Sequence, residues 1–282
     1  MKLKSGLYIV STPIGNLEDI TLRALNVLKN SDIILCEDTR VSKKLLAKHG
    51  IPVPLKIYND QSDDSGRQQI KNYLAAGKVL SLISDAGTPL ISDPGYKLVR
   101  ELIKDGYHVD ALPGACALIA ALTLSGLPSD KFLFAGFIPK TAKGKENLFQ
   151  ELSALNATLI FFDTASRLPS TLTIAQAVFG NREAVVAREL TKLYQEIKIL
   201  TLSELADHYQ KHSIKGEIVL LISGVSSSLG HQIVDLNNEV HLLLSVGKSA
   251  KSATDILYDR YKKSFSKSEI YQLVNKCKGD LI

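Results

Sequence analysis

Residues 84–95 read Ser-Asp-Ala-Gly-Thr-Pro-Leu-Ile-Ser-Asp-Pro-Gly, the densest cluster of glycine, proline and small polar residues in the chain. The apolar run Val79–Ile83 precedes this stretch, and residues 96–103 follow it with helical periodicity. This order predicts a buried strand, a long loop and then a helix. Ligands of open α/β sheets bind at the carboxyl ends of strands, where such loops gather. We therefore expect residues 84–95 to form part of a binding site.

The two aspartates of this loop predict different roles. Asp93 stands directly before Pro94, and aspartate at the N-cap with proline in the first turn is a common way to start a helix. We interpret Asp93 as the cap of the following helix. Asp85 stands at the strand end and has no equally clear structural task, so we expect Asp85 to bind a ligand.

Two neighbouring segments repeat this pattern. The predicted strand 7–10 leads into Ser-Thr-Pro-Ile-Gly-Asn at residues 11–16, and the predicted strand 108–112 leads into Pro113-Gly114. Strands that alternate with helices at this spacing predict a largely parallel sheet covered by helices. All three loops would then leave the sheet at the same edge. Each loop alone is typical of a tight strand-to-helix turn, but the three together favour a pocket.

A fourth strand end carries charge. Glu37-Asp38-Thr39-Arg40 follows the predicted strand 32–36. Asp38 or Thr39 would be a normal cap for the next helix. Glu37 and Arg40 would face the same edge as the three loops, and arginine suits bidentate contacts to phosphate. We therefore expect this strand end to orient a hydroxyl or to hold a phosphate.

Composition and motifs exclude several classes of protein. The 282 residues are 45% hydrophobic and 22% charged, which is typical of a globular protein with a substantial core. The net charge of +5 permits an anionic partner such as RNA without requiring one. The strand-end loops contain neither a G-x-G-x-x-G pattern nor a P-loop lysine motif, which disfavours a Rossmann site and an NTPase.

The remaining sequence signals concern redox chemistry and location. The three cysteines have no paired spacing, which argues against a disulfide framework and a zinc site. The start of the chain has no signal-peptide pattern, and no apolar stretch reaches transmembrane length. We expect a cytoplasmic protein without a metal ion and without membrane association.

The pattern of predicted elements divides the chain into three regions. We expect an N-terminal α/β domain at residues 1–138, a second α/β domain at 139–232 and a small helical region at 233–282. Near the first boundary, Lys140, Lys143 and Lys145 predict a basic patch. Such a patch is usually solvated surface, but beside a cleft it would suit an RNA backbone.

Several of these motifs resemble those of the ribosomal RNA small subunit methyltransferase I family, which has the tetrapyrrole-methylase fold. The resemblance extends from about Leu7 to Gly224, with the motifs in the family's order. It rests on residues 8–21, 36–40, 84–95, 112–117, 125–128, 134–139, 188–192 and 215–217.

Two segments depart from the family's pattern. After the first strand of the second domain the family usually has a run like Glu-Ser-Pro-His-Arg, whereas this chain has Asp163-Thr-Ala-Ser-Arg167. Only an acid at the start and the final arginine are kept. Cys116 stands where serine is usual, which is a nearly isosteric change.

The resemblance implies two α/β domains of class III methyltransferase type with a small C-terminal helical extension. It implies S-adenosylmethionine held in a folded conformation between the two domains, within a homodimer. The implied cofactor-binding residues are Ile14, Asp85, Ala86, Gly87, Leu90, Pro113, Cys116, Ala117, Asp163, Leu190 and Gly224.

The implied reaction is 2′-O-methylation of a cytidine in the decoding region of 16S rRNA, within the small ribosomal subunit. Methyl transfer from a sulfonium needs alignment and removal of a proton from the hydroxyl. Three residues are candidates for catalytic roles. Glu37 is the first candidate for contacting the ribose hydroxyl, and Asp38 is the second. Arg40 is the candidate for binding a phosphate or orienting the substrate. Two alternatives remain open: a methyltransferase of the same fold that acts on a tetrapyrrole or a protein side chain, and a non-catalytic ribosome-binding protein.

Overall fold

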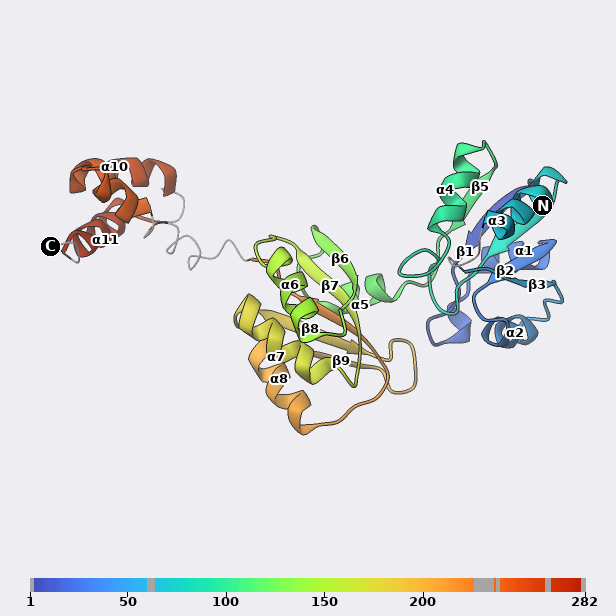
Figure 1. Ribbon diagram of the computed structural model, residues 1–282. Coiled ribbons are helices and arrows are strands. Elements are labelled where there is room, and N and C mark those ends of the chain that lie inside the picture. The colour runs from blue at the N-terminus through green and yellow to red at the C-terminus, as the bar shows by residue number, and fades with distance from the viewer. Residues whose placement is uncertain (1–2, 60–63, 226–235, 237–238, 262–264, 280–282) are drawn as a thin grey trace. The chain divides into compact units, whose positions relative to one another are not determined.

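The computed structural model describes residues 3–59, 64–225, 236, 239–261 and 265–279 (Figure 1). The chain forms two compact units. Unit 1 comprises Met1–Ser153 and Ala157–Ser223, and unit 2 comprises Ala154–Asn156 and Gly224–Ile282. The expected boundary after residue 138 falls within unit 1, and the one after residue 232 lies outside the described residues.

The first sheet of unit 1 is parallel throughout. Its strand order is β3-β2-β4-β1-β5, and each strand pairs with its neighbours in parallel, as the alternation of strands and helices predicts. The loops after β4, β1 and β5 therefore leave three adjacent strands at one edge. The strands are β1 (Gly6–Val10), β2 (Ile33–Cys36), β3 (Leu55–Ile57), β4 (Val79–Leu82) and β5 (Val109–Leu112).

Helices cover both faces of the first sheet. Tyr8 and Val10 share an apolar cluster with residues of α1 (Leu22–Lys29) and α2 (Thr39–Lys48). Leu7 shares another with residues of α3 (Asp64–Ala75) and α4 (Tyr96–Lys104). Successive strand residues point to opposite faces, so the short apolar strands bury side chains on both.

The start of α4 differs from the prediction. The helix begins at Tyr96, its N-cap is Gly95, and no side chain caps it, so the prediction that Asp93 caps this helix is wrong. Gly95 has a φ of 128°, which is incompatible with a right-handed helix, so the helix cannot start at Pro94 behind a cap at Asp93. A Cβ on Gly95 would lie 2.9 Å from Leu82 Cδ2, so the chain needs glycine at this turn.

The second sheet of unit 1 is mixed. Its order is β6-β7-β10-β8-β9; β6 pairs with β7 in parallel and the other pairings are antiparallel. β9 lies at one edge of this sheet, next to β8. The strands are β6 (Phe132–Phe137), β7 (Thr158–Thr164), β8 (Glu183–Arg188), β9 (Glu196–Thr201) and β10 (Glu217–Ile222).

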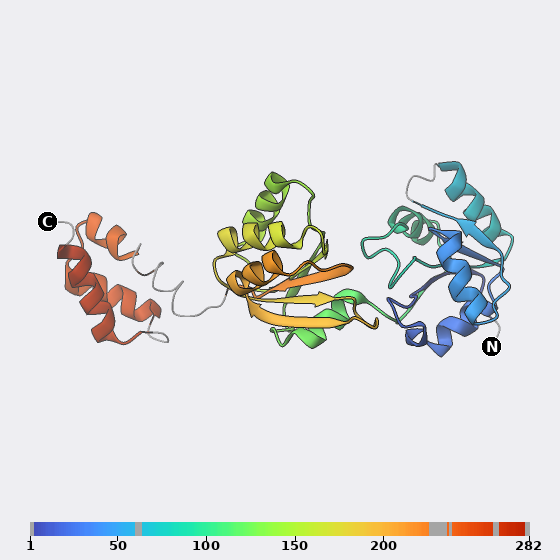
Figure 2. The same ribbon diagram turned by 90° about the horizontal axis from the view of Figure 1, so that it is seen from below.

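One helix connects the two sheets. The segment after β5 forms α5 (Ala117–Ser125), which packs on one face of the second sheet, while α6 (Ala142–Leu152), α7 (Leu168–Phe179) and α8 (Leu202–Lys211) cover the other (Figure 2). Ile160 lies in the cluster with α5, whereas Leu159 and Phe161 lie in the cluster with α6–α8. Because α5 starts where the loop after β5 ends, it carries that loop to the second sheet.

Lys145 of α6 is not part of a surface patch, contrary to the prediction. Only 2% of Lys145 is exposed, and its Nζ lies 2.6 Å from Ser170 Oγ. Thr141 caps α6. A helix that starts at this residue has Lys145, Phe149 and Leu152 together on its buried side. Burial lowers the pKa of Lys145.

Unit 2 is helical in the residues that the structure describes. It contains residues 239–245, α10 (Ala250–Tyr261) and α11 (Lys267–Gly279), around a small apolar cluster that includes Val240, Leu257 and Val274. Across the described parts of both units, every helix is too short or too polar to cross a membrane.

Candidate active site

The three predicted loops meet at the carboxyl edge of the first sheet. Thr12 and Gly87 exchange two backbone hydrogen bonds of 2.8 and 3.0 Å, which join the loops after β1 and β4. The Thr88 hydroxyl donates to the Ala115 carbonyl at 3.0 Å and lies 3.0 Å from Ser11 Oγ. Thr88 therefore ties the β4 loop to both neighbouring loops.

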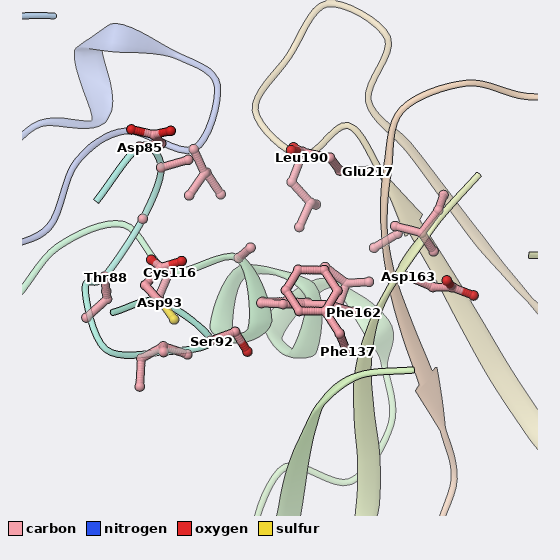
Figure 3. Close-up of a pocket in the computed structure, with 18 of the residues that line it drawn as sticks. Asp85, Thr88, Ser92, Asp93, Cys116, Phe137, Phe162, Asp163, Leu190 and Glu217 are labelled. Atoms are coloured by element: carbon pink, nitrogen blue, oxygen red, sulfur yellow. The ribbon is translucent and has the colours of Figure 1, made fainter. Parts of the chain in front are cut away.

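These loops form one wall of a cavity of about 330 Å³, a volume within the usual range of small-molecule sites. The second sheet forms the opposite wall, where Phe137 and Phe162 face Asp93 and Cys116 (Figure 3). The lining residues are Ile14, Asp85, Ala86, Gly87, Thr88, Ile91, Ser92, Asp93, Cys116, Ala117, Phe137, Phe162, Asp163, Thr164, Ala187, Glu189, Leu190, Glu217, Ile218 and Val219.

Most of the residues predicted to bind the cofactor line this cavity, but Leu90, Pro113 and Gly224 do not. The side chain of Leu90 packs against the cluster that contains Leu82 and Leu98, on the core side of the loop. Gly224 belongs to unit 2. The cavity therefore has the predicted location, with a slightly different lining.

The first loop fits closely against a turn of the second sheet. A Cβ on Gly15 would lie 2.5 Å from Lys192 Cγ and 2.7 Å from Thr191 Oγ1, so only glycine allows this approach. The Asn16 amide donates to Thr191 Oγ1 at 3.0 Å. Gly87 has φ 82°, and a Cβ there would lie 3.2 Å from Ile14 Cγ2. Glycine is thus required at two points around the cavity.

The turn at residues 189–192 is held by charge. Glu189 Oε1 accepts from Lys192 Nζ and from the Glu217 amide, each at 3.0 Å, and Lys192 Nζ also lies 2.9 Å from Glu217 Oε2. The hydrogen bond from the Glu217 amide is the main reason that the pKa of Glu189 is lowered. These contacts join two motifs that are separate in the sequence, 188–192 and 215–217.

Asp163 lines the cavity but directs its carboxylate away from the centre (Figure 3). Its side chain is fully buried and bonds to Arg167 Nη2 at 2.6 Å and Thr171 Oγ1 at 2.7 Å. The two positions that keep the family's pattern in this segment are therefore paired with each other. This pair fixes the end of β7 and holds the Asp163 carboxylate on the side of the strand away from the cavity centre.

The charged end of β2 lies outside the set of residues that line the cavity. Asp38 is the N-cap of α2: its Oδ1 accepts from the Arg40 amide at 2.8 Å, and its Oδ2 lies 2.6 Å from Arg40 Nη2. These bonds lower the pKa of Asp38 to about 2. The Asp38 amide donates to Asp85 Oδ1 at 3.3 Å, which links this strand end to the β4 loop. The capping interpretation of Asp38 is confirmed, while catalytic roles for Glu37, Asp38 and Arg40 stay predictions.

Asp93 is the cavity residue whose position the sequence interpretation missed most clearly. It is half-buried, and burial is the main reason that its pKa is raised. The charge of Asp85 raises this pKa further, while a hydrogen bond with the Ser84 hydroxyl opposes the shift.

The aromatic wall was also missed. Phe162 packs edge-on against Phe137, with ring centroids 5.4 Å apart, and Phe137 is 57% exposed. The alternation along β7 was the available signal, because it places Ile160 and Phe162 on the same face of the strand.

Comparisons with known proteins agree with this architecture. The profile of the Tetrapyrrole (Corrin/Porphyrin) Methylases matches residues 6–206. The chain is 58% identical over 278 residues to the ribosomal RNA small subunit methyltransferase I of Rickettsia prowazekii (strain Madrid E), which covers 99% of both chains. It is 44% identical over 218 residues to the protein of the same name from Thermotoga maritima, covering 77% of this chain and 98% of that relative.

A solved structure shows the same fold. The uroporphyrin-III C-methyl transferase of Thermus thermophilus, complexed with S-adenyl homocysteine, aligns with a TM-score of 0.54 and 18% identity, covering 77% of this chain and 97% of that chain. Together the matches confirm the predicted fold class and the predicted methyl donor, S-adenosylmethionine.

Proposed function

Because the chain belongs to the ribosomal RNA small subunit methyltransferase I family of tetrapyrrole methylases, we propose that it methylates the 2′-hydroxyl of a cytidine in the decoding region of 16S rRNA. The observation that carries this proposal is the 58% identity to the Rickettsia prowazekii relative across 99% of both chains. The expected substrate is the small ribosomal subunit.

The residues of the cavity fit S-adenosylmethionine, which supplies an activated methyl group on a cationic sulfonium. Asp85 brings negative charge to the loop wall, which suits a cationic ligand. Gly87, without a side chain, lets the backbone approach the ligand beside Ile14, and Leu190 contributes apolar surface on the opposite wall. In this proposal Ile14, residues 85–87, Cys116, Ala117 and Leu190 hold the cofactor.

The charged end of β2 suits the nucleic-acid side of the site. Arg40 has a side chain that is 87% exposed, and it is tethered to Asp38 at the edge of the sheet from which the loops leave. An exposed guanidinium can bind a phosphate while Asp38 fixes its direction. We assign Arg40 to the RNA backbone and place Glu37 beside it as a group that orients the ribose.

The test uses small ribosomal subunits from cells that lack this protein. They are incubated with the purified protein and S-adenosylmethionine labelled in the methyl group, and the labelled nucleotide is mapped by nuclease digestion and mass spectrometry. The expected result is label on the ribose of one cytidine of 16S rRNA. Label on protein or on a small molecule, with none on rRNA, would contradict the proposal and favour the alternatives on the same fold.

The family resemblance also supports a homodimer, and sedimentation equilibrium measures this directly. We expect twice the mass of the chain at micromolar concentration. A monomer that methylates subunits at the full rate would remove the dimer from the proposal without affecting the reaction.

A further inference from the structure

Asp93 occupies a place in the cavity that no role described so far explains. It lies on the loop wall beside Cys116, facing Phe137 and Phe162 across the cavity (Figure 3). It does not cap α4, because the cap is Gly95. Its half-buried carboxylate therefore has no part in starting the helix that follows it.

The backbone around Asp93 is strained. Leu90 and Ser92 both have positive φ values, 73° and 66°, although neither is glycine. Such conformations persist where the surrounding structure enforces them, and they gather at functional sites. Here Leu90 is fixed in the apolar cluster with Leu82 and Leu98, so the chain turns at Ser92 and presents Asp93 at the cavity.

The other carboxylates of the cavity have cationic or amide partners. Asp163 is paired with Arg167, while Glu189 and Glu217 share Lys192. Asp85 is exposed and accepts from the Asp38 amide.

Asp93 differs from these carboxylates. Within the described part of the chain, no lysine or arginine contributes to the shift of its pKa, which burial raises first and the charge of Asp85 raises further. Its partner is the Ser84 hydroxyl, which also lies 3.3 Å from the carbonyl oxygens of Ala86 and Gly87. A hydroxyl donates only one hydrogen bond at a time. When Asp93 takes up a proton, the Ser84 hydroxyl can therefore donate to one of these carbonyls instead of to Asp93.

We propose that Asp93 is the catalytic residue that accepts the proton of the ribose 2′-hydroxyl, in place of Glu37. This inference rests on the proposed function. As the bond from the ribose oxygen to the methyl carbon forms, the bond from that carbon to sulfur breaks and its electron pair stays on sulfur. The hydroxyl proton passes to an Asp93 carboxylate oxygen, and the protonated Asp93 later releases it to water.

The position of Asp93 supports this role better than the positions of the other candidates. Glu37 and Asp38 do not line the cavity, and Asp38 is held as a carboxylate by Arg40, with a pKa of about 2. A general base works best when its pKa approaches the working pH, and burial moves Asp93 in that direction. The cavity side of the β4 loop therefore carries the proton acceptor, and the β2 end remains free to position RNA.

The test compares three substitutions with the wild-type protein. Asp93→Asn keeps the shape of the side chain and removes its basicity, and Glu37→Gln does the same for the earlier candidate. Asp105→Asn is the matched control, because Asp105 is exposed at the opposite end of α4. Single-turnover methylation of small subunits and calorimetric binding of S-adenosylhomocysteine are measured for each.

We expect Asp93→Asn to slow methylation by about 10²–10⁴-fold, the usual contribution of a general base. Its affinity for S-adenosylhomocysteine should stay within about threefold of the wild type, because only chemistry is removed. Glu37→Gln should have a smaller effect than Asp93→Asn, and Asp105→Asn should match the wild type. Unchanged turnover in Asp93→Asn, or a loss fully explained by weaker cofactor binding, overturns the inference.

Two pH measurements give a further check, one of them independent of activity. The wild-type rate should rise with pH and level off above the pKa of Asp93, and this rise should vanish in Asp93→Asn. In protein labelled with ¹³C-aspartate, the carboxyl resonance lost in Asp93→Asn should titrate above the usual range of aspartate. The other titratable groups lining the cavity are Asp85, Cys116, Asp163, Glu189 and Glu217, so a rise that persists in Asp93→Asn belongs to one of them and contradicts the inference.

The design separates the two proposals. If the wild-type protein places no label on rRNA, the proposed function fails and the inference fails with it. If the wild-type protein labels rRNA and Asp93→Asn does so equally fast, only the inference fails.

Discussion

Asp38 and Asp93 each stand shortly before a helix of the first sheet, yet their carboxylates lie in opposite environments. Asp38 is the N-cap of α2, bonded to the amide and guanidinium of Arg40. Asp93 precedes the cap of α4, is half-buried beside a cavity, and its pKa is affected by a neighbouring carboxylate. Backbone geometry makes the difference, because Gly95, with a φ of 128°, interrupts the chain between Asp93 and the helix. The carboxylate at one strand end caps a helix, and the carboxylate at the other lines a cavity.

The largest effect that would sharpen this comparison is the loss of turnover in Asp93→Asn described above.

The next largest effect concerns Gly87. We expect Gly87→Ala to weaken S-adenosylhomocysteine binding by about tenfold or more, because the new methyl group would lie 3.2 Å from Ile14 at the cavity wall. Gly77→Ala is the matched control, since Gly77 has a similar φ of 79° with open space around it.

Both glycine substitutions should lower the free energy of unfolding by about 1 kcal/mol, because alanine is strained at positive φ. Calorimetry of binding and urea denaturation separate the two effects. Equal affinity in the two variants would show that the β4 end does not closely approach the cofactor.

The third prediction concerns pH and stability. The pKa of Asp93 is raised in the folded protein, so its stabilising contribution is present below the unfolded pKa and is lost as pH rises through the folded value. The pKa of Asp38 is lowered to about 2, so its contribution is present above the unfolded value and is lost as pH falls toward 2. As pH rises, the free energy of unfolding should therefore decrease through the contribution of Asp93 and increase through that of Asp38.

Urea denaturation at a series of pH values measures both slopes. Asp93→Asn should remove the decline with rising pH, and Asp38→Asn should remove the loss at acid pH while keeping an efficient N-cap. If both aspartates changed the free energy of unfolding in the same direction with pH, their environments would not be opposite and the comparison would be wrong.

The smallest expected effect comes from removing residues 226–282. The Thermotoga maritima relative matches over 218 residues that make up 98% of its own length, so a chain without a comparable extension exists in the family. Every residue that lines the cavity belongs to unit 1. Binding of S-adenosylhomocysteine should therefore change by less than about threefold in the truncated protein. Loss of binding would show that unit 2 supports the cavity.

The part of the site that could be predicted follows from strand geometry. Parallel strands send their loops to one edge, so the meeting of residues 11–16, 84–95 and 113–117 was foreseeable from periodicity and glycine content. Positive φ at Leu90 and Ser92 was not, because neither residue type signals a left-handed conformation. The place of Asp93 in the cavity was missed because the turn at Gly95, and not Asp93 with Pro94, starts the following helix.

Other failures have similarly local causes. The edge strand β9 has lysine and glutamate between its apolar residues and lacks a continuous apolar run, so it was not foreseen. Lys145 was expected on the surface by residue type, yet the phase of α6 turns it toward Ser170. In both cases the tertiary surroundings outweighed the character of the residue.

The path of α5 has a consequence for how the protein is made. This helix is apolar almost throughout, and Leu118, Ala121 and Leu122 are buried against strands made from residues 158–222. Once α5 has left the ribosome, it is exposed to solvent until about a hundred more residues have followed it, several seconds of translation at usual rates. During that interval the first sheet is complete while its neighbouring helix has nothing to pack against. Newly made protein should therefore be most vulnerable to aggregation at this stage of synthesis.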